Sequence, residues 1–474
     1  MNDPNLSSAA QLAQAVRNRV ISPVELAEAH LARIERLNPR LNAFVHVDAE
    51  GALARAKLAE NELAQRSSRD GLGPLHGVPI SIKSSVDVAG FPCECGTLLR
   101  KGNTPHADAT LVSRLRAAGA VILGNTNVPE FLMAYETENL LYGRTNNPWD
   151  LSCTPGGSSG GESAAIASGC AAAGIGSDGG GSIRIPAHYT GICGLKPTPG
   201  RVPSTGHYPG SAGPFKELGV VGPLARTVQD LEIIFRVVAG YDPADPASAP
   251  VPLRTWTRDE IRRLPIAFLE DDGTTPVTPE TAAAVRTAAA ALRDQGFQVE
   301  AWPSGGFERI WNLWWTLFGR GIQLAMDATV AGREDDLSPM YTTFRKMVGA
   351  EPPLTAQELL DTLLQRDAVR AAFLARMERF PILLCPACAV PAFHHGERKW
   401  MIQGSEVRYL KAMSYSQWFN LLGNPAAVVP VGQSPEGLPI GVQIVGRPWE
   451  DEAVLAVAAL IDSACGGFRR PPLE

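Results

Sequence analysis

Pro155-Gly-Gly-Ser-Ser-Gly-Gly161 and Gly176-Ser-Asp-Gly-Gly-Gly-Ser-Ile-Arg184 are the two glycine- and serine-rich motifs on which the fold prediction for this sequence depends. The alanine-rich segment 162–170 between them has the composition of a buried helix. Glycine and serine at this density are also typical of a flexible linker. However, Asp178 and Arg184 stand among apolar neighbours, which indicates ordered loops whose backbone approaches a ligand closely. We interpret these two opposite charges as supports of the loop rather than as proton carriers.

The second motif predicts a nucleophile for acyl transfer at Ser182. A serine hydroxyl needs a base that removes its proton, and the oxyanion that forms needs preorganised donors. The residues before Ser182 are Gly179, Gly180 and Gly181, which have no side chains. Their N–H groups, together with that of Ser182, can therefore form one concave nest for an oxyanion.

The sequence indicates less clearly which residue is the base that takes the proton of Ser182. None of the eight histidines lies in a sequence environment that singles it out. Lys83 ends an apolar segment, residues 77–83, that we expect to be a strand. Burial would lower the pKa of Lys83, so that a neutral amine at pH 7 is feasible, and Ser158 could relay a proton between Lys83 and Ser182. A lysine in this position is more often a partly exposed strand end, so the residues alone leave the base open.

The composition suits a large globular protein with a buried core, since 45% of the 474 residues are hydrophobic and 19% are charged. The formal net charge of −6 argues against nucleic acid as the main ligand, because phosphate binding needs a basic surface. The N-terminus lacks the pattern of a signal peptide, and no run of about 18 apolar residues predicts a membrane span. We therefore expect a cytoplasmic protein with neither a membrane span nor a nucleic-acid partner.

Four of the eight cysteines could on paper form a zinc site, as Cys93-Glu-Cys95 and Cys385-Pro-Ala-Cys388. Cys385, however, follows Pro-Ile-Leu-Leu in a predicted buried strand, where cysteine usually acts as a small apolar residue. We therefore expect no metal.

Helices and strands alternate along most of the chain, which predicts a single α/β domain over residues 1–474. A helix is expected to start at the capping box of Ser22 and to stop at Asn38-Pro39. Residues 426–431 and 440–445 read as neighbouring strands joined by a turn, and residues 451–463 as a closing helix.

These motifs resemble the amidase signature family. The matching segments, quoted by their numbers in this chain, are residues 77–83, 124–130, 146–148, 155–161, 178–186, 191–197 and 437–446. The resemblance implies a Ser–cis-Ser–Lys triad of Ser182, Ser158 and Lys83, with a cis peptide between Gly157 and Ser158. It also implies an oxyanion hole in the backbone of residues 179–182, and a large mixed, twisted sheet of about eleven strands with helices on both faces. No metal and no cofactor are implied.

Within this family pattern we expect a helical N-terminal segment at residues 1–60, a signature core at about 73–225 and a variable substrate-pocket region at about 300–415. The candidates for an apolar substrate pocket are Leu132, Met133, Tyr135, Trp311 and Trp315. The aromatic cluster at Trp311 and Trp315 is more often core than pocket. The expected partner is a small-molecule amide-like substrate, and a homodimer is compatible with the sequence.

The expected reaction is hydrolysis of C–N bonds in carboxylic amides through an acyl-enzyme on Ser182, with esters and carbamates as further substrates. Residues 127–139 and 213–223 look closest to the fatty acid amide hydrolase-like branch. One alternative is the A-type subunit of an aminoacyl-tRNA amidotransferase, which shares the signature. Another is an α/β-hydrolase-type esterase, because residues 156–160 satisfy G-x-S-x-G; it would need His394 or His395 as base.

Overall fold

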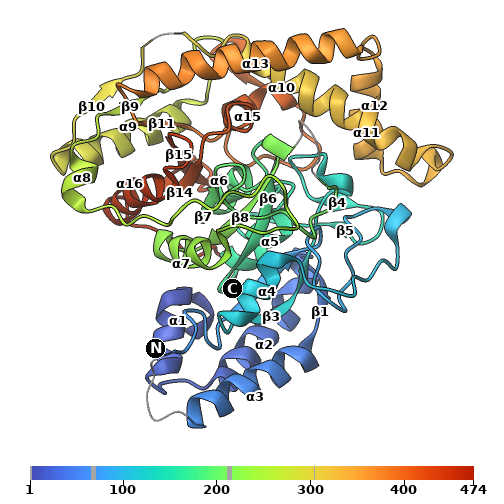
Figure 1. Cartoon of the computed structure of the whole chain (residues 1–474), viewed down its shortest axis with the longest axis vertical. Coiled ribbons are helices and arrows are strands. Elements are labelled where there is room, and N and C mark those ends of the chain that lie inside the picture. Colours follow the sequence, from blue (N-terminus) through green and yellow to red (C-terminus); the bar gives the residue numbers. More distant parts are fainter. Residues whose placement is uncertain (1–2, 66–70, 211–215, 304, 474) are drawn as a thin grey trace.

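Strands from both ends of the chain build one mixed sheet in the computed structural model, which describes residues 3–65, 71–210, 216–303 and 305–473. In these residues the sheet has 11 strands in the order β1-β3-β2-β6-β8-β7-β14-β15-β11-β9-β10 (Figure 1). Their bounds are β1 Phe44–Val47, β2 Pro79–Lys83, β3 Val121–Thr126, β6 Ala173–Asp178, β7 Cys193–Lys196, β8 Val220–Ala225, β9 Ile266–Phe268, β10 Val299–Ala301, β11 Ile382–Pro386, β14 Ala426–Gln433 and β15 Pro439–Gly446. The predicted α/β fold with a mixed sheet of about eleven strands is confirmed.

The sheet combines parallel and antiparallel pairs. Strand β2 is parallel to both β3 and β6, whereas β6, β8, β7, β14 and β15 run antiparallel in succession. Because successive side chains of a strand point to opposite faces, Ile382 and Leu384 pack into the core on one face and Leu383 into the core on the other. Both faces of the sheet are therefore buried.

Helices cover each face. One face packs against α7 (Val228–Val238), α9 (Pro279–Asp294) and α16 (Asp451–Ala464). The other packs against α5 (Gly160–Ala167), α6 (Arg184–Thr190) and α15 (Ser414–Leu421). Helices α5 and α6 start within the last residues of the two glycine–serine motifs, so this second group of helices positions Ser158 and Ser182.

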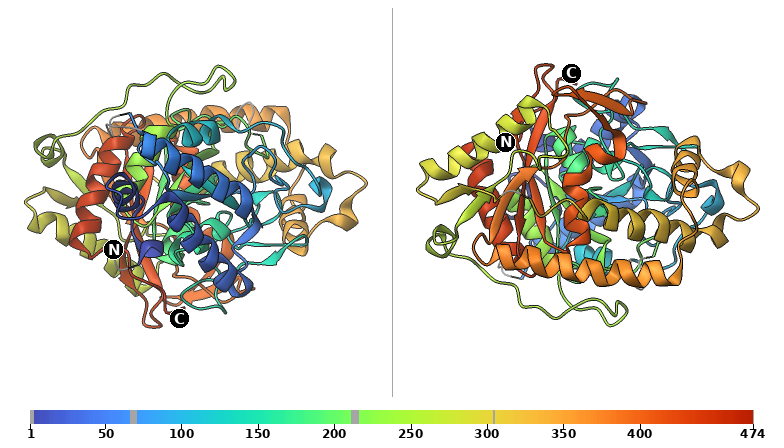
Figure 2. Two further views of the ribbon diagram at one scale, coloured as in Figure 1. Left: turned by 90° about the horizontal axis from the view of Figure 1, so that it is seen from below. Right: turned by 90° about the horizontal axis from the view of Figure 1, so that it is seen from above.

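The N-terminal helices and the region predicted to vary lie at opposite ends of the molecule (Figure 1). At one end are α1 (Ala9–Arg17), α2 (Pro23–Leu41) and α3 (Ala49–Gln65), with α4 (Thr110–Ala117) close by. At the other are α10 (Ile310–Trp314), α11 (Gly321–Val330), α12 (Pro339–Gly349) and α13 (Ala356–Met377). Figure 2 shows the two ends in turn, with the N-terminal helices facing the viewer in one picture and α13 in the other.

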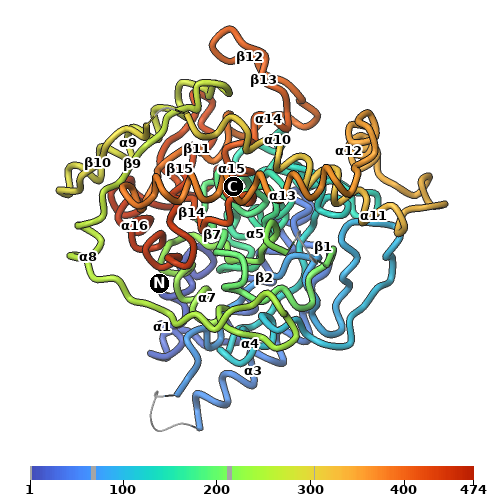
Figure 3. Tube along the Cα trace, turned by 45° about the horizontal axis from the view of Figure 1, so that its top comes forward, coloured from blue at the N-terminus to red at the C-terminus, as the bar shows by residue number. Residues whose placement is uncertain are grey.

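A small hairpin, β12 (Lys399–Ile402) and β13 (Ser405–Arg408), projects from this second end and leads into α14 (Tyr409–Ala412) (Figure 3). Between α10 and α11 the helix contains a π-helical turn, η5 (Trp315–Arg320), a feature that is frequent at functional sites. The aromatic cluster of residues 311–318 lies in these elements. None of the helices in the described residues is both long and apolar enough to cross a membrane.

The predicted end of α2 is wrong. The helix continues through Pro39 to Leu41, where Asn42 adopts a left-handed conformation and donates its N–H to Asn38 O at 2.7 Å. Proline in the last turn of a helix removes only one intrahelical hydrogen bond, and the ring sits where the helix is about to end. Pro39 therefore marks the final turn of α2 but does not stop the helix.

Candidate active site

Lys83 is the last residue of β2, and the alternation of side chains along the strand decides which face of the sheet Lys83 points to. Ile80 and Ile82 pack into the core on one face, so Ser81 and Lys83 point to the face that carries α5. The Lys83 side chain is fully buried. Its Nζ donates to Ser158 Oγ at 2.7 Å and to the hydroxyls of two other serines. These are Ser159, at 2.9 Å, and Ser177, at 3.0 Å.

Burial lowers the pKa of Lys83 to about 7, against the opposing effect of the nearby carboxylates Asp178 and Glu162. Glu162 is also fully buried, on α5, and burial raises its pKa to about 7 although Ser81 and Thr126 both donate hydrogen bonds to it. A lysine amine without its proton is thus accessible near neutral pH at the point where it touches Ser158.

Ser158 lies in the tight loop that enters α5. The Gly157–Ser158 peptide is cis, as the resemblance predicts. The backbone of Gly157 packs closely against another loop, because a Cβ at this position would lie 2.5 Å from Glu136 O. The neighbouring Ser159 N–H donates to Ser182 O at 3.2 Å, which ties the first motif to the second.

Ser182 follows a loop in which three backbone N–H groups have no acceptor among the described residues: those of Gly179, Gly180 and Ser182 itself. The fourth predicted donor, Gly181, differs. Its N–H donates to Asp178 Oδ1 at 2.8 Å, and its φ of 121° lies in the region that favours glycine. The structure thus leaves three of the four expected donors available to a ligand.

Aromatic side chains fix the other side of the same loop. Tyr135 Oη donates to Gly180 O at 3.0 Å, and Trp314 Nε1 donates to Gly179 O at 3.1 Å. In a trans peptide the carbonyl and the following N–H point in opposite directions. The N–H groups of Gly180 and Gly181 therefore point away from Trp314 and Tyr135. Tyr135 is therefore a support of the loop.

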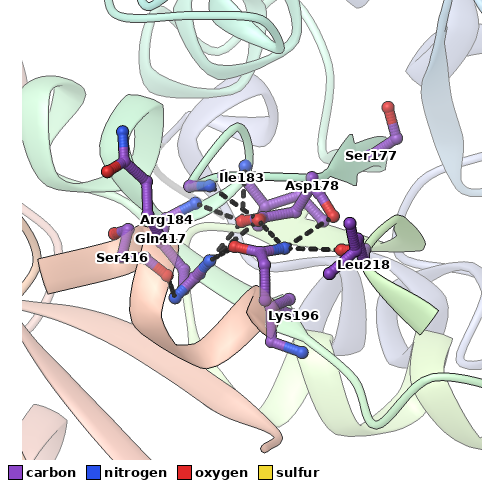
Figure 4. A network of polar contacts seen from close by, with 12 residues as sticks. Ser177, Asp178, Ile183, Arg184, Lys196, Leu218, Ser416 and Gln417 are labelled. Atoms are coloured by element: carbon purple, nitrogen blue, oxygen red, sulfur yellow. Dashed lines mark hydrogen bonds and ion pairs between the residues drawn. The ribbon is translucent and has the colours of Figure 1, made fainter. Parts of the chain in front are cut away.

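Asp178 and Arg184 form a buried pair that anchors the loop to distant parts of the chain (Figure 4). Arg184 donates to both carboxylate oxygens of Asp178, at 2.8 and 3.0 Å, and also to Ser416 O on α15 and to Gln443 Oε1 on β15. Asn420 on α15 donates to the backbone oxygen and to Oδ1 of Asp178, each at 3.0 Å. Burial acts to raise the pKa of Asp178, but Arg184 outweighs it and holds that pKa well below its usual range. Asp178 is therefore an ionised anchor.

The cavity above the two serines encloses about 770 Å³ of space, part of which is open to solvent. It is lined by Ser158 and Ser182, and by two of the five predicted pocket residues, Leu132 and Met133. Trp311 and Trp315 do not line it and border a separate groove on the surface. Sequence reasoning missed the apolar residues that do line this cavity from η5 and α11: Phe318, Ile322, Ala325 and Met326.

His207 is a second residue that sequence reasoning missed, and it lines the cavity as well. Its Nδ1 lies 3.1 Å from Pro209 O and must carry the proton, so its Nε2 accepts from Ser85 Oγ at 3.3 Å. Burial, followed by the proximity of Lys83, lowers the pKa of His207 to about 3, so it is neutral. No local motif marks this histidine, and its position in the fold is what brings it to the site.

The histidines that the α/β-hydrolase reading requires lie away from Ser158. His394 Nδ1 lies beside Ser152 and Cys153, and neither His394 nor His395 lines the cavity of Ser158. Across the described part of the chain, no three histidine, cysteine or carboxylate side chains cluster in a way that could hold a metal ion. Residues 211–215, which include part of the segment compared with the fatty acid amide hydrolase-like branch, lie outside the described residues.

Comparison with known proteins agrees with this geometry. The protein family described as "Amidase" matches residues 25–455. An indoleacetamide hydrolase of Bradyrhizobium diazoefficiens is 34% identical, over 97% of this chain and 86% of that protein. The A-type subunit of the glutamyl-tRNA(Gln) amidotransferase of Acidothermus cellulolyticus is 35% identical, over 98% of this chain and 95% of that protein.

A solved structure of a bacterial aryl acylamidase, a member of the amidase signature enzymes, has a similar fold. It superposes with a TM-score of 0.85 at 29% sequence identity, and the match covers 97% of this chain and 96% of that one. The likeness therefore extends over nearly the whole sheet and its helices.

Proposed function

The chain belongs to the amidase family, and we propose that it hydrolyses the C–N bond of carboxylic amides through an acyl-enzyme on Ser182. The observation that carries this proposal is the buried contact between Lys83 Nζ and Ser158 Oγ, 2.7 Å long, beside a cavity that Ser158 and Ser182 both line. Next to it, the N–H groups of Gly179, Gly180 and Ser182 have no acceptor among the described residues. Nucleophile, proton relay and oxyanion donors are the parts that acyl transfer requires.

In the proposed first step, Ser182 Oγ attacks the carbonyl carbon while its proton passes to Ser158 and the proton of Ser158 passes to Lys83. The oxyanion that forms is held by the N–H groups of Gly179, Gly180 and Ser182. The C–N bond then breaks, and the leaving amine takes a proton back from Lys83 through Ser158. A water molecule then attacks the acyl-enzyme and gives its proton through Ser158 to Lys83. Ser182 Oγ leaves the acyl group and takes that proton back along the same relay.

Two other possibilities have support: further substrates for the same site, and a role as an amidotransferase subunit. Esters and carbamates present the same carbonyl group to Ser182, so they are candidate substrates of the same site. The A-type amidotransferase reading is supported by relatives such as the one of Acidothermus cellulolyticus. A protein of that kind would need partner subunits to transfer ammonia, whereas a hydrolase would act alone.

The test is a hydrolysis panel of matched amides, esters and carbamates of increasing acyl length, run on the isolated protein with Ser182→Ala as the blank. We expect turnover of amides by the natural chain and loss of that turnover in Ser182→Ala, which removes the nucleophile without disturbing a packed side chain. Undiminished amide hydrolysis in Ser182→Ala, with an unchanged melting temperature, would refute the assignment. Absence of activity until amidotransferase partner proteins are added would favour the alternative.

A further inference from the structure

A second depression lies on the surface beside α12, and we call it the α12 groove. Its apolar walls come from Met133, Trp311, Trp315, Met340, Phe344 and Met347. The rings of Trp311 and Trp315 are stacked, with an interplanar angle of 2° and centroids 6.1 Å apart. Met347 is 40% exposed, so part of this apolar wall is open to solvent.

A third, small pocket shares lining residues with both the α12 groove and the cavity of Ser182, and we call it the passage. At its inner end the passage is lined by Gly180 and Ser182, and at its outer end by Phe344 and Leu410, which also line the groove. Met133 lines the active-site cavity, the passage and the groove. The three pockets are therefore neighbours, and this order is the route that an extended molecule with its reacting carbonyl at Ser182 would follow to the α12 groove.

The charges of the groove are almost all neutralised by one another. Arg398 pairs with Glu136, and the hairpin residues Lys399 and Arg408 both pair with Glu406. Glu351, the other acid of the groove, accepts from Trp315 Nε1 and lies 3.6 Å from Arg320.

Lys411 is the exception. In the described residues no carboxylate lies within ion-pair distance of its ammonium, and its Nζ rests 5.4 Å from the centre of the Trp311 ring. The side chain is partly buried, and burial lowers the pKa of Lys411, with Asp272 acting in the opposite direction. Because no carboxylate of the described residues contacts the Lys411 ammonium, an anionic group of a ligand can make a charge-assisted hydrogen bond to it.

We propose that the α12 groove holds the far end of an elongated substrate, and that Lys411 binds a carboxylate or similar anionic group at that end. The apolar walls and the passage favour a hydrocarbon chain between the amide and the anion. This inference rests on the proposed function, because it takes the reacting carbonyl to be at Ser182. It names the substrate class as long amides with a negatively charged terminus.

The test compares two sets of amides that differ only at the tip of a hydrocarbon chain, which ends in either a carboxylate or a methyl group. One set carries the chain on the acyl side, as p-nitroanilides. The other carries it on the amine side, and its hydrolysis is measured through the release of the free amine. For the natural chain we expect kcat/KM to favour the carboxylate tip at chain lengths that reach the groove, and not at shorter ones.

Lys411→Met should lower this carboxylate-over-methyl ratio by about tenfold in one of the two sets, mainly through KM, because one charge-assisted contact is lost. Lys411→Arg should restore part of it. Lys346 on α12 is an exposed lysine that does not line the groove, so Lys346→Met is the matched control and should keep the natural ratio. An unchanged ratio in Lys411→Met, or an equal loss in Lys346→Met, would overturn the proposal.

A binding measurement separates this proposal from the hydrolase assignment. In the Ser182→Ala background, calorimetric titration with the carboxylate-tipped amide should show binding that weakens about tenfold in Ser182→Ala/Lys411→Met. If no amide is hydrolysed but this difference is seen, the hydrolase proposal fails and the anion site stands. If amides are hydrolysed and the two affinities are equal, the anion site fails alone.

Discussion

The three hydroxyl groups around Lys83 match its three N–H donors when the amine is charged. When Lys83 loses its proton it keeps two donors and gains one lone pair, so one of the three hydroxyls must turn and donate to it. Ser159 Oγ already has a backbone acceptor, Ser177 O at 3.3 Å. Ser158 has the shortest contact, 2.7 Å, and is the hydroxyl best placed to donate to the neutral amine.

This arrangement makes activity depend on the charge of Lys83. Because burial lowers the pKa of Lys83 to about 7, the neutral base is a minor form below pH 7 and the major form above it. With chemistry rate-limiting, kcat/KM should fall about tenfold for each pH unit below 7 and reach a plateau at mildly alkaline pH. The measurement is a kcat/KM profile from pH 5 to 9, and a flat profile would contradict the role of Lys83.

Glu162 provides the control for that profile. The carboxylate form of Glu162 raises the pKa of Lys83, and burial raises the pKa of Glu162 itself to about 7. Glu162→Gln should therefore shift the acid limb to lower pH and keep the plateau if Lys83 titrates, and should remove the acid limb if Glu162 titrates. The amide of glutamine can still accept from Ser81 and donate to Thr126, whose hydroxyls hold the carboxylate in the natural chain. An acid limb that does not move would show that another group is titrating.

At the scale of elements, the loop before Ser182 is held by segments far away in the sequence. Arg184 reaches β15 through Gln443, and Asn420 on α15 connects Asp178 to Leu218 O at 2.9 Å (Figure 4). Because Asp178 O belongs to the same peptide as the Gly179 N–H, Asn420 of α15 fixes the direction of that N–H group. A change in α15 should affect the transition state without touching the substrate.

Asn420→Ala tests this connection. It removes four hydrogen bonds, three that Asn420 donates to buried acceptors and one that it accepts from Arg184. We therefore expect the unfolding free energy to fall by about 2–4 kcal/mol and kcat to fall about tenfold or more, with KM little changed. The control is Asn424→Ala, which also removes a buried amide, one that donates to Gly446 O at 2.8 Å but does not contact Asp178. If the two variants lose kcat equally, the loss reflects stability and not the position of the loop.

At the scale of the molecule, the sequence predicted the local motifs better than their assembly. Lys83 and the two serines could be found because each ends or follows a motif with a recognisable composition. His207, Phe318 and Asn420 could not, because they reach the site only through the pairing of distant strands and the packing of α11 and α15. Trp311 and Trp315 do not line the cavity of Ser182, which Phe318 of η5 lines instead, and they border the α12 groove.

The prediction of a single domain over residues 1–474 can be tested through α16. Its Ile461 is fully buried in the core on one face of the sheet, whereas most of the nine tryptophans lie in or against the core on the other face. Strands β14 and β15 contribute side chains to both cores, so a loss of packing on one face should be felt on the other. Ile461→Ala should therefore lower the unfolding free energy by about 2–5 kcal/mol, whether unfolding is followed by circular dichroism or by tryptophan fluorescence.

The measurement is equilibrium urea unfolding followed by far-ultraviolet circular dichroism and by tryptophan fluorescence. The two midpoints should coincide in the natural chain and move together in Ile461→Ala, because a cooperative unit unfolds in one transition. Ile461→Val should shift both by a smaller, equal amount, about 0.5–1.5 kcal/mol. If the fluorescence midpoint stays in place while the dichroism midpoint falls, the tryptophan-rich end around α10–α13 unfolds on its own, and residues 1–474 form more than one domain.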